Sequence, residues 1–331
     1  MISTSFSNFD PVIPYNHTPM KVVSGLPDAA ASSPCVLTIG NFDGLHLGHQ
    51  FILSTVVQQA RMLDLRPAVL TFDPHPVRIL APEHAPKLIT TVAQKLRLME
   101  SMGIEVVFTV RFDQEFAALT PDAFIEMYLV NGLRTKVLCV GSNFTFGHKQ
   151  KGTLETLRSW RHEFDVVEIA PVLARGAVVS STQVRQNIQE GRVSRACRLL
   201  GRWFEIEGRI VEGAGRGRNV TVPTINLEPE NELLPRRGVY ITRIALDSGY
   251  FSDSITNIGV RPTFGENRET IETFVLYSAI PGAARLASLQ FLKRVRDERK
   301  FDSPELLRER ITRDIQIGEK YFRRLQASTH A

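Results

Sequence analysis

The chain has 331 residues, and at about 150 residues per domain this length predicts two domains, each large enough to bury a core. Its hydrophobic content of 43% and aromatic content of 8% are typical of a globular protein and exclude a disordered chain. The net charge of +5 is spread evenly before and after Gly201, so the sequence carries no basic arm of the kind that binds nucleic acid.

The cysteines and the N-terminal residues indicate the cellular compartment of the protein. Cys35, Cys139 and Cys197 lie far apart in apolar stretches, without the spacing of a zinc site. We therefore expect buried free thiols in a reducing compartment, and a cytoplasmic protein. No apolar run approaches the roughly 20 residues of a transmembrane helix. Residues 1–19 are polar, lack the features of a signal peptide and are expected to form a disordered extension.

Short apolar runs alternate with amphipathic stretches from Cys35 onward. This pattern predicts an α/β domain over residues 20–200, with a doubly wound parallel sheet and helices on both faces. Ligands of such sheets bind beyond the carboxyl ends of the strands. Buried strands are predicted at 35–40, 66–73, 105–110, 135–141 and near 165, and helices at 47–63, 90–103, 120–132 (with Thr120 as N-cap) and 182–200.

The pattern changes after Gly201, where short alternating strands are separated by Gly and Pro. This texture predicts a second domain over residues 201–331 that is a small antiparallel barrel or sandwich, closed by a C-terminal helix. Strands are expected at 204–213, 238–247, 254–260, 270–278 and 287–301, and the helix at about 303–325.

The most informative segment, residues 40–49, leaves a buried strand, crosses a loop and opens a helix. His46 and His49 are three residues apart, so both imidazoles lie on one face of the first helical turn. The N–H groups and the dipole of the helix make an anion site there, and Gly48 allows a phosphate to approach the backbone. We expect the imidazoles to donate hydrogen bonds to a reacting phosphoryl group. The alternative is a pair of solvated histidines at a helix start.

Two further segments also follow strand ends. In residues 140–148, Asn143 is suited to bind a base or ribose, and Phe144 and Phe146 are suited to flank a planar ring. In residues 179–185, hydroxyl groups precede a helix that is expected to end at Gly191, and these groups either cap its N-terminus or join Arg185 in binding a triphosphate.

A glycine-rich segment, residues 212–226, opens the second domain. It is not a Walker loop, because G-x-x-x-x-G-K-[ST] does not occur in the chain. Its backbone amides can nevertheless curl around phosphates, and Thr224 and Asn226 offer the hard oxygen ligands that Mg²⁺ prefers. The alternative is a glycine-rich hairpin loop in solvent.

These motifs resemble a known family. GNFDGLHLGH, TFDPHP, GSNFTFG and VSSTQVR, in this order, are similar to the adenylyltransferase half of bacterial bifunctional riboflavin kinase/FAD synthetases, a Rossmann-like H-x-G-H nucleotidyltransferase domain. In the second half, PTIN at 223–226 resembles the Pro-Thr-Ala-Asn motif of riboflavin kinases, and NIGVRPTF at 257–264 and Glu272 match their other site residues. The resemblance begins near Met20, which matches the family's usual Met-Lys-Val opening and is an alternative start of the chain.

The resemblance implies two ATP-dependent reactions with Mg²⁺. The second domain would phosphorylate riboflavin to FMN, and the first would convert FMN and ATP to FAD and pyrophosphate. By this resemblance His46 and His49 bind the ATP phosphates and stabilise the transition state, Glu272 accepts the riboflavin hydroxyl proton, and Thr224 and Asn226 hold the metal. Nucleotide or flavin contacts are further implied for Gly40, Asn41, Phe42, Asp43, Gly48, His75, Asn143, Phe144, Phe146, Ser181, Thr182, Arg185, Gly215, Arg218 and Arg296.

Two of these residues, His75 and Glu272, could have a purely structural role instead of a role in the site. The second half of the chain also departs from the family in three places. His75 would otherwise serve only a Pro-flanked turn, and Glu272 would be a charge at a strand end. Ile225 replaces an alanine and is expected to add bulk beside the metal ligands, Thr221-Val222 replaces Gly-Phe, and residues 280–286 replace an Asp-Leu-Tyr-Gly-like turn.

Two other functions stay open, the first of them because of these departures. One is a monofunctional FAD synthetase with a degenerate kinase barrel, and the other is a nucleic-acid-binding barrel, suggested by a pI of about 9.2. The main interpretation predicts small-molecule substrates, no nucleic acid, no membrane, and a monomer or transient homo-oligomer.

Overall fold

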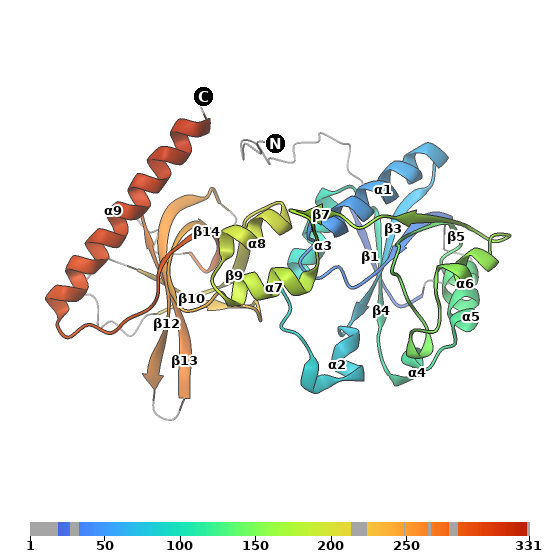
Figure 1. Ribbon diagram of the computed structural model, residues 1–331, viewed down its shortest axis with the longest axis horizontal. Helices are drawn as coiled ribbons and strands as arrows, with labels where there is room; N and C mark the ends of the chain where they lie inside the picture. Colours follow the sequence, from blue (N-terminus) through green and yellow to red (C-terminus); the bar gives the residue numbers. More distant parts are fainter. Residues whose placement is uncertain are drawn as a thin grey trace. The chain divides into compact units, whose positions relative to one another are not determined.

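The computed structural model describes residues 19–26, 33–212, 224–247, 249–263, 266–277 and 284–329. The chain divides into two compact units. The sheet unit comprises the described residues up to Lys87 together with Val92–Ser180, and the barrel unit comprises Leu88–Thr91 and the described residues from Ser181 onward (Figure 1). None of the described helices is long and apolar enough to cross a membrane.

The sheet unit is built on a parallel sheet with the strand order β1-β4-β3-β2-β5-β6, which confirms the predicted doubly wound α/β class. Its central strands are buried from both faces, and for this reason they appear in the sequence as continuous apolar runs. The edge strand β1 is short and largely exposed, so it lacks that signal and was not predicted. The strands are Lys21–Ser24 (β1), Cys35–Ile39 (β2), Arg66–Asp73 (β3), Val106–Arg111 (β4), Thr135–Gly141 (β5) and Asp165–Ile169 (β6).

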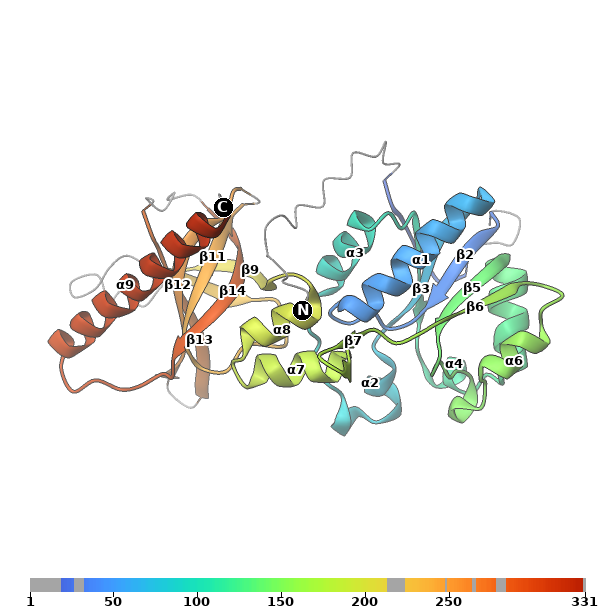
Figure 2. The same cartoon turned by 45° about the horizontal axis from the view of Figure 1, so that its top comes forward.

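Helices cover both faces of this sheet (Figure 2). On one face, α1 (Leu47–Leu63) and α3 (Val92–Ser101) pack in a cluster with β2, β3 and β4. On the other, α5 (Pro121–Phe124), its π-helical continuation η3 (Ile125–Gly132) and α6 (Leu154–Ser159) form a second cluster. The remaining elements are α2 (Pro76–Leu80), η2 (Pro82–His84), α4 (Gln114–Ala117), η4 (His148–Gln150), β7 (Leu173–Ala174) and β8 (Ala177–Val178).

Two local predictions in this region had different outcomes. Thr120 is the N-cap of α5 as expected, since its hydroxyl accepts a hydrogen bond of 3.2 Å from the Ala123 N–H. The span 182–200 is not one helix, because the chain forms α7 (Ser181–Gln189) and α8 (Val193–Leu200). The helix end expected at Gly191 is confirmed. Gly191, with φ of +75°, separates them by a left-handed turn that suits glycine.

The barrel unit contains a closed antiparallel barrel with the order β10-β13-β12-β11-β14-β9, followed by the helix α9 (Pro304–Thr329). The structure therefore selects the barrel over the sandwich. β10 was not predicted, because its residues were interpreted as part of a ligand-binding loop. The strands are Phe204–Val211 (β9), Ile225–Pro229 (β10), Gly238–Leu246 (β11), Ser252–Thr263 (β12), Glu266–Val275 (β13) and Leu286–Arg296 (β14).

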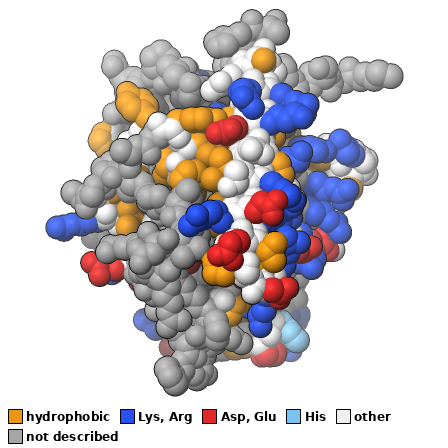
Figure 3. Space-filling view, turned by 90° about the vertical axis from the view of Figure 1, so that its left-hand side faces the viewer, with side chains coloured by type: hydrophobic (Ala, Val, Ile, Leu, Met, Phe, Trp, Pro, Cys, Tyr) orange, Lys and Arg blue, Asp and Glu red, His pale blue; other side chains and the backbone are white. Residues whose placement is uncertain are grey.

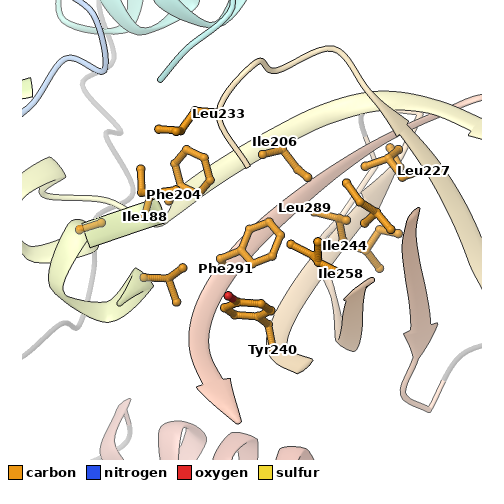
Figure 4. Packing of buried hydrophobic residues seen from close by; sticks show 14 of the residues in the cluster. Ile188, Phe204, Ile206, Leu227, Leu233, Tyr240, Ile244, Ile258, Leu289 and Phe291 are labelled. Carbon is orange, nitrogen blue, oxygen red and sulfur yellow. The ribbon is translucent and has the colours of Figure 1, made fainter. Parts of the chain in front are cut away.

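The interior of the barrel is filled by apolar side chains from alternate strand positions, including Phe204, Tyr240 and Phe291 (Figure 4). Ile188 of α7 and Ile89 of the segment Leu88–Thr91 belong to the same cluster. The barrel core is thus assembled from parts of the chain that precede Gly201 as well as from the barrel strands.

The cysteines of the described residues fulfil the sequence expectation of buried free thiols. Cys35 and Cys139 lie in neighbouring strands of the sheet, and Cys197 lies in α8. Burial raises the pKa of each thiol to about 12. A thiol with so high a pKa carries little thiolate at neutral pH and is a poor nucleophile.

Candidate active sites

The loop between β2 and α1 has an unusual backbone. Phe42, Gly44 and Leu45 have φ angles of 50°, 79° and 37°, in the left-handed region that bulky side chains rarely adopt. The Phe42 and Leu45 side chains are buried in the hydrophobic cluster beneath α1, which holds the loop in this form. Backbone strain retained in this way is a feature of ligand-binding sites.

The two predicted histidines lie together where this loop enters α1. His46 is the N-cap of the helix, and its Nδ1 accepts a hydrogen bond of 3.3 Å from the His49 N–H. The two rings stack with centroids 3.7 Å apart, and the Phe42 ring contacts His49 edge-on at 5.2 Å. Because Nδ1 of His46 is an acceptor, the proton of the neutral ring is on Nε2. The Nε2–H group of His46 is therefore the donor that would form a hydrogen bond to a phosphate oxygen.

Lys95 of α3 reaches the same loop and was missed by the sequence reasoning. Its Nζ donates to the Thr71 hydroxyl (3.1 Å) near the end of β3 and lies 3.5 Å from the Asn41 carbonyl oxygen. Burial lowers the pKa of the ammonium, and the charges of Asp43 and Asp73 partly oppose that shift. In the sequence of an amphipathic helix, a lysine that contacts a neighbouring loop looks the same as one that faces solvent. The contact of Lys95 is therefore visible only in the fold.

Other predicted residues follow strands that neighbour β2. Since β3, β2 and β5 are adjacent and parallel, the segments after them leave from the same edge of the sheet. After β3, His75 caps α2 by accepting from the Val77 N–H (3.3 Å), which is the structural role left open above. After β5, Asn143 is exposed, and the ring of Phe144 stacks on Phe146 with centroids 5.6 Å apart.

The two phenylalanines of this segment have different surroundings. Phe146 is buried against Phe124 in the hydrophobic core, so its ring supports Phe144 from below. Phe144 is half-buried and is the ring of the pair that lies nearer the surface.

Ser181, Thr182 and Arg185 lie in the first half of α7, which belongs to the barrel unit. Ser181 and Thr182 are the first two helical residues, so the position before the helix is occupied by Ser180. The structure does not place these residues in one compact unit with His46 and His49. Their contact with a triphosphate stays a prediction.

On the barrel, a row of polar residues crosses three adjacent strands. Glu272 of β13 is paired with Asn226 of β10 on one side and with Asn257 of β12 on the other. Directly paired residues of neighbouring strands project from the same face of a sheet. Their chain neighbours Ile225 and Thr273 are buried inside the barrel, so the row lies on its outer face and presents one carboxylate and two amides there.

Strand alternation also corrects the expectation for Ile225. Its side chain is buried in the barrel core and does not add bulk on the face of Asn226. Thr224, which immediately precedes β10, is exposed. Gly215 and Arg218, as well as the departures at 221–222 and 280–283, lie outside the described residues. Within the described part, no three His, Cys, Asp or Glu side chains cluster as metal ligands.

Arg296 has a structural partner that the sequence did not reveal. Its Nε and Nη2 donate to Oδ2 of Asp314 on α9 (2.9 and 2.7 Å), and its Nη1 donates to the Asp297 carbonyl (3.0 Å). Asp314 is buried and also lies 3.2 Å from Arg310. The guanidinium thus joins the end of β14 to α9, and its predicted ligand contact stays a prediction.

Replacing Arg296 with Met is expected to lower the free energy of unfolding of the barrel unit by about 2 kcal/mol, because it removes the charged hydrogen bonds to the buried Asp314 while Arg310 still compensates that carboxylate. The chain has two tryptophans, Trp160 in the sheet unit and Trp203 in the barrel unit, where it packs against a buried cluster that includes Phe322 of α9. Urea unfolding followed by Trp203 fluorescence in a Trp160→Phe background measures the change. An unaltered unfolding midpoint would show that the ion pair is not stabilising.

Comparison with known proteins shows what the chain is similar to. A family model described as FAD synthetase matches residues 28–183, and one described as riboflavin kinase matches residues 200–322. The bifunctional riboflavin kinase/FMN adenylyltransferase of Escherichia coli (strain K12) is 34% identical over 92% of this chain and 98% of its own length. Its counterpart in Bacillus subtilis (strain 168) is 34% identical over 88% and 93%.

A solved structure extends the similarity to three dimensions. The crystal structure described as a macrolide-efflux protein from Streptococcus pneumoniae is 27% identical to this chain and superposes with a TM-score of 0.82. The superposed region spans 90% of this chain and 98% of the chain in the solved structure. The similarity therefore includes both the parallel sheet and the barrel.

Proposed function

Because the chain belongs to the family of bifunctional riboflavin kinase/FMN adenylyltransferases, we propose that it makes FAD from riboflavin in two ATP-dependent steps. The barrel domain transfers the γ-phosphoryl group of ATP to riboflavin, giving FMN and ADP. The sheet domain transfers the adenylyl group of a second ATP to FMN, giving FAD and pyrophosphate. The tandem match of both families over one chain is the observation that carries this proposal. We assign residues 20–200 to the second reaction and residues 201–331 to the first.

In adenylyl transfer, a phosphate oxygen of FMN attacks the α-phosphorus of ATP while pyrophosphate leaves. No covalent enzyme intermediate is needed, so catalysis depends on positioning and on stabilising charge. The stacked rings of His46 and His49 at the start of α1 donate hydrogen bonds to the α-phosphate as its charge develops. The N-terminal dipole of the 17-residue helix acts in the same direction.

Substituting Ala for Gly48 is expected to slow FAD formation from FMN about 10-fold, because small misplacements of catalytic groups are costly. A Cβ at this position would lie 3.1 Å from Cε1 and 3.2 Å from Nδ1 of His46, so the ring has to move. Steady-state rates of FAD formation measure the effect, and riboflavin phosphorylation by the same variant is the control. Equal loss of both activities would indicate general misfolding and not a displaced ring.

In riboflavin phosphorylation, Glu272 accepts the proton of the 5′-hydroxyl as the γ-phosphoryl group transfers. Thr224 and Asn226 supply hydroxyl and amide oxygens of the kind that hold Mg²⁺, and Asn226 is paired with Glu272 across the barrel surface. When bound, Mg²⁺ neutralises the charge of the transferring phosphates. Asn257, on the other side of Glu272, completes the polar row and can orient the carboxylate.

The monofunctional alternative is now less well supported. One of its three arguments was the bulk of Ile225, and that side chain lies inside the barrel. The test is to incubate the enzyme with riboflavin, ATP and Mg²⁺, with and without a chelator, and to separate the flavins by chromatography. Metal-dependent FMN and FAD support both reactions, whereas FAD from supplied FMN alone would leave only the synthetase. Absence of both products would overturn the proposal.

We further propose that the protein is cytoplasmic, acts on small molecules without a membrane or nucleic-acid partner, and is a monomer or transient homo-oligomer. The buried free thiols support a reducing compartment. On the face of the barrel unit in Figure 3, basic side chains are most frequent along the right-hand side, and acidic side chains are interspersed among them. Such a mixed surface is unlike the single-sign patch of an electrostatic nucleic-acid binder.

A further inference from the structure

Lys95 is a half-buried cation that neither reaction accounts for. Its Nζ is held by the Thr71 hydroxyl at 3.1 Å and lies 3.5 Å from the Asn41 carbonyl oxygen. Thr71 is itself fully buried, and its hydroxyl also lies 3.5 Å from that carbonyl. Two donors from separate elements, α3 and β3, therefore meet at one backbone atom of the loop that follows β2.

That backbone atom comes directly before the unusual part of the loop. The left-handed conformations of Phe42, Gly44 and Leu45 come next, and the loop ends at His46. A backbone in sparsely populated conformations persists only where its surroundings over-determine it. On one side the loop is held by the buried Phe42 and Leu45 side chains, and at its first carbonyl it is held by Lys95 and Thr71.

Placing the lysine ammonium at this position costs free energy, because the group is partly removed from water. Taking an ammonium group out of water is unfavourable unless nearby groups compensate it. Here the compensation comes from the Thr71 hydroxyl and from the carboxylates of Asp43 and Asp73. Asp43 is in the same loop and Asp73 is the last residue of β3, so the ammonium also reduces the negative charge at the edge where an ATP phosphate would bind.

We propose that Lys95 is a positioning residue for adenylyl transfer: held by Thr71, its ammonium fixes the Asn41 carbonyl and with it the loop that places His46 and His49. This inference rests on the proposed function of the histidine pair. Lys95 acts through the backbone of the loop, so it is not a catalytic residue. It belongs to α3, outside all of the motifs that identified the site from the sequence.

The test is Lys95→Met, which keeps the unbranched apolar stem of the side chain and removes the ammonium group. The kcat of FAD formation from FMN is expected to fall about 10- to 100-fold, the range that one hydrogen bond from a charged group provides. The KM for ATP is expected to change less than about threefold, because positioning acts in the transition state. Riboflavin phosphorylation by the same chain is the internal control. Lys136→Met, an exposed lysine in the second position of β5, is the matched substitution and is expected to be without effect.

A second variant separates positioning from folding. Thr71→Val removes the acceptor of the lysine with nearly unchanged volume, and is expected to lower kcat in the same direction. If both groups act on one loop, the double variant loses little more than the more impaired single variant. Should Lys95→Met fail to fold, Thr71→Val alone carries the kcat test.

Three results would overturn the inference: a Lys95→Met kcat within threefold of wild type, a raised KM for ATP with unchanged kcat, or fully additive losses in the double variant. A wild-type enzyme that makes no FAD from FMN would overturn the proposed function and this inference with it. A working wild type with an unimpaired Lys95→Met variant would overturn this inference alone.

Discussion

Glu272→Gln is expected to reduce FMN formation from riboflavin about 10²- to 10⁴-fold, the contribution of a general base, while the same protein still converts supplied FMN to FAD. Glutamine has the size of glutamate and keeps hydrogen-bonding capacity beside Asn226 and Asn257. It cannot accept the proton of the riboflavin hydroxyl. Initial rates with each flavin, measured by chromatography, give both activities from one preparation.

The control for this prediction is Glu269→Gln on the same strand. Glu269 is exposed and forms an ion pair of 3.4 Å with Arg237, away from the polar row. Exposed ion pairs contribute little to stability, so this variant is expected to retain both activities. Near-normal riboflavin phosphorylation by Glu272→Gln would remove Glu272 from the role of general base.

Removing the imidazoles is expected to impair FAD formation and to spare riboflavin phosphorylation, which is the opposite of the effect of Glu272→Gln. With His46→Asn and His49→Asn, FAD formation should fall about 10²- to 10³-fold for each variant, the magnitude found when one preorganised donor to a transition state is removed. Riboflavin phosphorylation should persist, so FMN should accumulate when riboflavin is supplied.

The choice of asparagine separates catalysis from folding at His46. This residue caps α1, and an alanine there would cost about 1 kcal/mol of stability. Asparagine is a good N-cap, so a variant with normal thermal unfolding and no FAD formation isolates the role of the ring. If His46→Asn made FAD at close to the wild-type rate, the histidine would serve only as a helix cap.

The parts of the fold that sequence predicts well are those with a local cause. The helix expected at 47–63 is observed as Leu47–Leu63, and the strand expected at 66–73 is observed as Arg66–Asp73, because periodicity and flanking turns define both. The helix end at Gly191 was predicted, but the second helix after it was not separated within the span 182–200, since the amphipathic pattern continues on both sides of Gly191.

The parts that sequence misses depend on what the chain contacts elsewhere. Ile225 was placed beside the metal ligands because it is next to them in sequence, whereas alternation along β10 turns it into the barrel. Arg296 and Lys95 have the signature of surface cations, and only α9 and the loop after β2 show what each one binds. The pairing of Glu272 with Asn226 and Asn257 depends on the register of the three strands, which none of the motifs in the sequence specifies.

The central claim is that one chain performs both reactions, and the origin of the two phosphorus atoms in FAD tests it most directly. The enzyme is supplied with riboflavin and Mg²⁺, and with ATP labelled either at the γ- or at the α-phosphorus. The account predicts that FAD acquires both labels, the γ-label on the flavin side of the diphosphate bridge and the α-label on the adenosine side. FAD that forms only when FMN is supplied, and that never carries the γ-label, would contradict it.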